Sequence, residues 1–232
     1  MEGKTMEENS QAHILRDLRL AMKRKGMGGL VRDLLLHPGN QAIALYRLYR
    51  WLYLKGHLYL AFFGYRLNYF LTGVDIHPDA DIGPDFHLDH PQGVLIGRRT
   101  KIGRGVRIYS KVSVGAVGLP EENPFLEIKD YVQIIHGAQV GGSCTIGEYA
   151  VIAANVVNVN RDVPPYATVV GNMGRIVKIN GERVNPDDYK NYKYNPADFH
   201  GPPEWHDPSK DEQRWETSWI DPKMYGEGGK NR

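Results

Sequence analysis

Histidines and aspartates are concentrated in one short stretch of the sequence. It contains Asp75-Ile76-His77-Pro78 and, slightly further on, His87-Leu88-Asp89-His90. A carboxylate beside an imidazole fixes the tautomer of the ring and raises its basicity, which suits a general base that takes a proton from a hydroxyl. We expect Asp75 and His90 to form this pair, because their separation of fifteen residues allows them to lie on neighbouring coils of the repeat described below.

Other uses of the same residues compete with this interpretation. His77 precedes a proline and is expected to be a turn residue, and His87 is expected to be exposed. A metal site is the remaining chemical alternative for the cluster. No helical or paired-cysteine spacing supports it, so we expect no metal.

The region around this cluster repeats with a period of six residues. The repeat slips by two residues between Leu88 and Ile96, and a longer gap follows Val114. The apolar residues that head the units are Ile76, Ile82, Leu88, Ile96, Ile102, Ile108, Val114, Ile128, Ile134, Val140, Ile146 and Ile152.

An internal period of six with an apolar head predicts a mainly β fold, a parallel β-helix in which three units form one triangular coil. The heads point inward and stack into a continuous core. The fourth residue after each head is usually small or β-branched and is also expected inside. Cys144 occupies such a position, so we expect a core residue and not a nucleophile.

A loop is expected where the repeat is interrupted. The step from Val114 to Ile128 is fourteen residues instead of twelve, and Gly115–Glu127 contains Gly118, Pro120 and Pro124. Long loops on a rigid scaffold often carry function.

The N-terminal region, residues 1–72, has a helical pattern. We expect helices over about 10–36, 41–54 and 58–71, and the third is apolar on most of its surface. The open first coil of a β-helix needs a cap, which these helices can supply. Contact with a membrane surface is an alternative for the third helix, but packing is favoured.

Two further segments complete the predicted organisation. Residues 73–179 form the β-helix, and residues 180–232 form an irregular arm rich in proline. The arm also holds Trp205, Trp215 and Trp219, which argue against a purely solvated tail. We expect it to dock its aromatic side chains on its own or a neighbouring subunit.

The composition argues against several classes of protein, namely nucleic-acid-binding, disulfide-bonded and membrane-spanning proteins. The net charge of +2 is too small to indicate a nucleic-acid partner, and one cysteine excludes an internal disulfide. The N-terminus lacks the apolar run of a signal peptide, and we find no stretch long enough to span a bilayer. A cytoplasmic location is expected.

The chain resembles the serine acetyltransferase branch of the hexapeptide-repeat acyltransferases over about residues 38–178. The resemblance rests on Val74-Asp75-Ile76-His77-Pro78, Leu88-Asp89-His90, Gly93-Val94-Leu95-Ile96-Gly97, Val163-Pro164-Pro165 and Gly171 with Arg175-Ile176. It implies a left-handed β-helix that forms a homotrimer, with acetyl-coenzyme A bound in the groove between adjacent subunits.

The resemblance also implies roles for individual residues. His90 would be the general base, Asp75 its partner and Asp89 a contact to the acceptor. The residues that would bind acetyl-coenzyme A are Ala116, His136 and Ala154, through backbone groups along the pantetheine arm, and Arg175 or Lys178, at the phosphates.

The projecting loop departs from the family pattern. Serine acetyltransferases carry Arg-His-Pro there, and the arginine binds the serine carboxylate, whereas the aligned residues here are Pro124, Phe125 and Leu126. An unpaired carboxylate in a desolvated site is costly. The sequence therefore predicts an acetyl-coenzyme A-dependent O-acetyltransferase that acts on a small-molecule hydroxyl other than serine, such as a sugar.

Three alternatives stay open. The chain could acetylate serine and take its cation from elsewhere, for example Lys190 or Lys193. It could be a non-catalytic hexapeptide-repeat trimer. It could also be a metal-dependent lyase that resembles the hexapeptide carbonic anhydrases.

Overall fold

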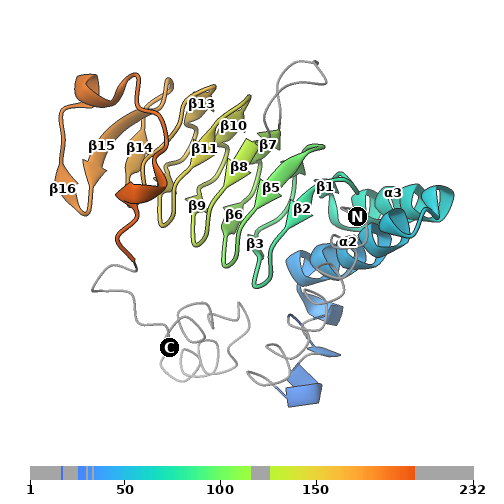
Figure 1. Cartoon of the computed structure of the whole chain (residues 1–232). Coiled ribbons are helices and arrows are strands. Elements are labelled where there is room, and N and C mark those ends of the chain that lie inside the picture. The colour runs from blue at the N-terminus through green and yellow to red at the C-terminus, as the bar shows by residue number, and fades with distance from the viewer. Residues whose placement is uncertain (1–16, 18–25, 30, 33, 116–125, 202–232) are drawn as a thin grey trace, which may run out of the picture. The chain divides into compact units, whose positions relative to one another are not determined.

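Three β-sheets, whose coil strands are all parallel, form the faces of a coiled stack in the computed structural model of the chain (Figure 1). The structure describes Asp17 and residues 26–29, 31–32, 34–115 and 126–201. Consecutive strands of the coil belong to different sheets, so each sheet takes every third strand. This is the parallel β-helix that the period of six predicts.

The strands are short. The first sheet contains β1 (Asp75–Ile76), β4 (Leu95–Ile96), β7 (Ser113–Gly115), β10 (Gln139–Gly141) and β13 (Val157–Val159). The second contains β2 (Asp81–Ile82), β5 (Thr100–Ile102), β8 (Leu126–Ile128) and β11 (Thr145–Ile146). The third contains β3 (His87–Asp89), β6 (Arg107–Tyr109), β9 (Gln133–Ile134), β12 (Val151–Ile152), β14 (Thr168–Val170), β15 (Arg175–Ile179) and β16 (Glu182–Arg183).

The predicted heads form the core. Every head from Ile76 to Ile152 is buried, and heads on neighbouring coils are paired in register, as Leu88 is with Ile108. Cys144 is buried among them, and burial raises the pKa of its thiol to about 11. This burial confirms the expected core position of Cys144.

The interruption after Val114 is larger than the sequence count indicates. Val114 lies in β7 of the first sheet and Ile128 in β8 of the second, and these are successive faces of the coil. The step of fourteen therefore replaces one step of six and not two, because Ile128 pairs with Ile102 across the sheet. The inserted segment, residues 116–125, lies outside the described residues.

Two helices precede the coil. α2 spans Pro38–Leu54 and α3 spans Leu58–Thr72. The first of them begins three residues before the expected start at Gln41, because Pro38 occupies the first turn and His37 is the extended N-cap. Residues 26–29, 31–32 and 34–36 are helical, within the predicted range of about 10–36.

Tyrosines of α2 satisfy carbonyl groups of the first coil. The hydroxyl of Tyr46 donates to the Ala80 carbonyl at 2.7 Å, and that of Tyr49 donates to the Ile76 carbonyl at 2.6 Å. Both rings are buried. The first coil has no preceding coil to donate hydrogen bonds to its carbonyl groups, so side chains of the helix donate them instead.

Two buried arginines of α2 extend the same cap. Arg47 donates to the carbonyls of Ile82 and Gly83 at 2.5 and 2.6 Å, and Arg50 forms an ion pair with Asp81 at 2.7 Å. The helices therefore cap the N-terminal end of the coil, as predicted. No helix among the described residues is long and apolar enough to cross a membrane.

The C-terminal end of the coil is closed differently. β15 runs antiparallel to both of its neighbours, β14 and β16. The chain then continues through the short 3₁₀ helices η1 (Pro186–Tyr189) and η2 (Pro196–Asp198).

The arm then packs back on the coil. The Tyr194 hydroxyl donates to Glu148 at 3.0 Å, and the Phe199 ring stacks on Tyr149 and Tyr166. Part of the arm thus docks aromatic side chains on its own chain. The three tryptophans expected to do so lie outside the described residues.

Candidate active site

His90 and Asp75 lie on neighbouring coils at one corner of the β-helix. His90 directly follows β3, is exposed, and has a left-handed backbone with φ +52°. His90 begins a turn that is hydrogen-bonded to the segment around Asp75. The Gly93 amide donates to the Gly73 carbonyl at 3.0 Å, and the Asp75 amide donates to the Val94 carbonyl at 2.9 Å. The slip of two residues in the repeat forms this turn.

Tyr65 of α3 reaches the site through Asp75. Its hydroxyl donates to Asp75 Oδ1 at 2.5 Å. Burial and this hydrogen bond to the carboxylate raise the pKa of Tyr65 to about 12, so the phenol is a donor at neutral pH. Sequence reasoning missed Tyr65, since nothing in a helical pattern indicates which side chain meets the first strand.

Asp89 is held by an arginine of the next coil. Arg107 Nη1 donates to Asp89 Oδ2 at 2.7 Å across the β3–β6 pair, in which His87 is opposite Arg107. Leu88 and Ile108 point into the core, so the side chains on either side of them lie on the outer face of the sheet. Sequence reasoning missed Arg107. Its position immediately before the inward-facing head Ile108 does indicate that its side chain points outward.

His136 and Ala154 occupy the same corner on successive coils. The Asn155 amide donates to the His136 carbonyl at 2.9 Å, and the His136 Nδ1 lies 2.6 Å from the Ser110 hydroxyl. Both His136 and Ala154 are exposed. The structure therefore brings together two of the three positions expected along the pantetheine arm, and the third, Ala116, lies outside the described residues.

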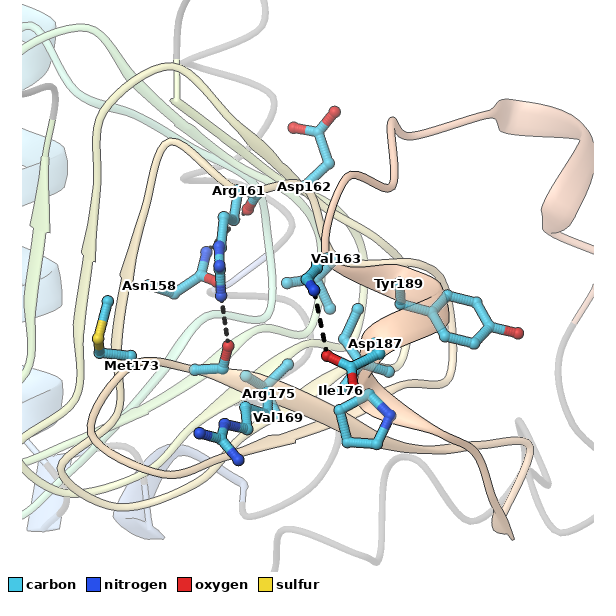
Figure 2. A pocket seen from close by; sticks show the side chains of 13 residues that line it. Asn158, Arg161, Asp162, Val163, Val169, Met173, Arg175, Ile176, Asp187 and Tyr189 are labelled. Carbon is cyan, nitrogen blue, oxygen red and sulfur yellow. Dashed lines mark hydrogen bonds and ion pairs between the residues drawn. The ribbon is translucent and has the colours of Figure 1, made fainter.

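Arg175 and Lys178 both belong to β15 but differ in their surroundings. Arg175 lines a cavity of about 490 Å³ between the last coil and η1, and Lys178 does not. Figure 2 shows Arg161 at the same cavity. Its Nη1 donates to the Gly174 carbonyl at 3.0 Å. Arg161 is a second cation at this cavity that sequence reasoning did not single out.

The remaining histidines of the cluster have local partners. His77 Nδ1 accepts a hydrogen bond from the Asp79 amide at 3.0 Å, in keeping with its expected place in a turn. Burial lowers the pKa of His77. The expectation that His87 is exposed is wrong, because its side chain is half-buried and lies 3.4 Å from the buried carboxylate of Asp85.

Metal binding has no geometric support in the part of the chain that the structure describes. There, no group of three histidine, cysteine, aspartate or glutamate side chains is placed to hold an ion.

Comparison with known proteins identifies the family. Residues 126–157 match the family described as bacterial transferase hexapeptide (six repeats). The chain is 40% identical over 154 residues to a protein of Bacillus subtilis named serine acetyltransferase, which covers 66% of this chain and 70% of that protein.

Solved structures agree with the sequence match. A soybean serine acetyltransferase complexed with serine superimposes with a TM-score of 0.63 at 33% identity, covering 73% of this chain and 70% of that one. A serine acetyltransferase in complex with CoA superimposes with a TM-score of 0.61 at 30% identity, covering 76% of this chain and 73% of that one.

These similarities extend well beyond residues 126–157, because the alignment with the Bacillus subtilis protein covers 154 residues. They confirm the left-handed hand of the β-helix and the acyltransferase class that the motifs around His90 predict. With its coil, its helical cap and its Asp75 and His90 motifs in place, this acyltransferase belongs to the serine acetyltransferase family.

Proposed function

We propose that the protein transfers an acetyl group from acetyl-coenzyme A to the hydroxyl of serine. The observation that carries this proposal is the extended similarity to proteins named serine acetyltransferase, including structures with serine and with CoA. The corner that holds Asp75 and His90, with Asp89 at the end of the adjoining strand β3, supports it with the groups that the reaction needs.

His90 acts as the general base. Its imidazole takes the proton of the acceptor hydroxyl while the hydroxyl oxygen attacks the thioester carbonyl, and it returns the proton to the departing thiolate of coenzyme A. Asp75 stabilises the imidazolium that forms between these two steps. Tyr65 holds one oxygen of Asp75 and so fixes the direction of the other.

Acetyl-coenzyme A lies along the column of corners that contains His136 and Ala154. Its pantetheine arm runs past these exposed residues, and Arg175 and Arg161, two of the cations that line the far cavity, meet its phosphates. Ala116 would complete the backbone contacts along this arm. The groove is closed by a neighbouring subunit of a homotrimer, in which each active site lies between two chains.

The loop sequence and the names of the relatives indicate different acceptors. The loop Gly115–Glu127 lacks lysine, arginine and histidine, and this led us to predict an acceptor other than serine. The names of the relatives do not support that prediction and favour serine instead. A hydroxyl acceptor without a carboxylate, such as a sugar, remains a second candidate, on the single observation that residues 115–127 contain no cation.

Thiol release from acetyl-coenzyme A distinguishes these candidates. The purified protein would be assayed with serine, with serinamide, which has no carboxylate, and with a panel of sugars. Turnover that is fastest with serine is the expected result. Turnover with a sugar but not with serine would overturn the choice of acceptor, and CoA binding without turnover of any acceptor would favour the non-catalytic alternative.

A further inference from the structure

The cation that the projecting loop lacks has a counterpart beside Asp89. Arg107 and Asp89 form an ion pair of 2.7 Å, and their side chains are only 9% and 18% exposed. A pair with so little solvent contact is screened weakly, and its geometry is fixed by the two paired strands. The ion pair therefore fixes the guanidinium of Arg107 beside Asp89, the residue that precedes His90.

We propose that Arg107 determines acceptor specificity by binding the carboxylate of the amino-acid acceptor. This inference rests on the proposed function, which makes serine the acceptor. Serine carries an ammonium group and a carboxylate on one carbon, and Asp89 and Arg107 present the complementary pair of charges on adjacent strands.

The chemistry of the guanidinium suits this role. It is planar, carries its N–H donors on more than one edge, and stays charged at any pH of interest, so it can hold two carboxylates at once. Asp89 alone would attract the ammonium group but repel the carboxylate. With Arg107 beside it, the site accepts a zwitterion without leaving either charge unpaired.

Other cations near the site are less suitable. Lys111 is exposed and packs beside Gly93, in the turn that follows His90. Lys111 therefore lies at the corner of the coil, whereas Asp89 lies on the face formed by the third sheet. Lys190, a cation that the sequence offered for this role, pairs with Asp187 in η1, and η1 contacts β15 near the other end of the third sheet.

The test compares serine with serinamide in three variants, Arg107→Gln, Arg107→Lys and Lys111→Gln. Serinamide keeps the ammonium group and the hydroxyl but has no carboxylate, so the ratio of kcat/KM for the two acceptors isolates the carboxylate contact. Arg107→Gln should lose about 100-fold in kcat/KM with serine and no more than about 3-fold with serinamide. Arg107→Lys should recover part of the loss, and Lys111→Gln should leave the ratio unchanged.

The outcomes separate this inference from the proposed function. Equal losses with both acceptors, or no loss, would overturn the role of Arg107 while wild-type turnover of serine still stands. Absence of serine turnover in the wild type would overturn both. CoA affinity measured by calorimetry should be the same in all variants, and this excludes misfolding as the cause of a selective loss.

Discussion

The hydroxyl of Tyr65 donates a 2.5 Å hydrogen bond to Asp75 Oδ1, and so joins the helical cap to the first strand of the coil. A residue of α3 thereby orients a carboxylate of the candidate active site. The cap therefore has two functions in this fold, since it closes the open coil through Tyr46 and Tyr49 and also positions Asp75.

Replacement of Tyr65 with Phe should lower kcat about 10-fold, the effect of losing one hydrogen bond to a charged group. The ring contacts with Tyr49 and Phe62 are kept in this variant. In the proposed mechanism Asp75 acts through His90, so the acidic limb of the kcat–pH profile should move, which a purely structural role would not produce. Tyr69→Phe, on an exposed part of the same helix, is the matched control, and an identical change in both variants would contradict the prediction.

Replacement of His90 with Asn should lower kcat at least about 100-fold, which is the usual contribution of a general base. Asn is chosen because it tolerates the left-handed backbone at φ +52° better than Ala does. Arg99→Asn provides a control at another left-handed corner, φ +56°, away from the site. A His90 variant that retains most of its activity would remove this residue from the mechanism.

The regular part of the fold was predictable from the sequence because it depends on a local rule. A head every six residues points inward wherever it occurs, so the buried column from Ile76 to Ile152 follows from counting. The size of the insertion after Val114 could not be predicted in this way. Counting residues does not show whether the chain between Val114 and Ile128 covers one face of the coil or two.

The candidate site was predictable only in part, for a related reason. Asp75 and His90 belong to motifs, whereas Tyr65 and Arg107 act through contacts between elements. The helix register decides that Tyr65 faces Asp75. The slip of two residues decides that Arg107 is opposite His87, and a strict coil of three sixes would have placed it differently.

The stability of the protein should fall in mild acid because of His77. Burial lowers the pKa of this imidazole in the folded state, helped by Arg98 and opposed by the carboxylates of Asp79 and Asp75. The unfolded chain therefore binds more protons below about pH 6.5, and stability decreases as the pH falls from there toward the folded-state pKa.

This pH dependence can be measured as the fall in Tm between about pH 7.5 and pH 5.5, a range that brackets the titration of a free imidazole. His77→Asn keeps an acceptor for the Asp79 amide and removes the titration, so its Tm should fall less than that of the wild type. His57→Asn, at an exposed histidine, should behave like the wild type. Parallel curves for all three proteins would contradict the assignment.

Replacement of Arg50 with Met should destabilise the protein by about 3 kcal/mol, because a buried acceptor that loses its donor costs about 1–3 kcal/mol. The side chain is 2% exposed and donates to the carbonyls of Pro78 and Ala80 as well as to Asp81, and Met can replace none of these bonds. Urea unfolding measures the change. Lys55→Met, at the exposed end of the same helix, should change stability by less than about 0.5 kcal/mol.

Replacement of Arg175 with Gln should weaken CoA binding about 10-fold, as expected for the loss of one charge-assisted contact to phosphate. Lys178→Gln should change it by less than about 2-fold, because Lys178 does not line the cavity that Arg175 and Arg161 share. Calorimetry at low and high salt gives both affinities, and the difference between the two variants should shrink as salt screens the contact. A larger loss for Lys178→Gln than for Arg175→Gln would move the phosphates out of this cavity and to the exposed face of β15.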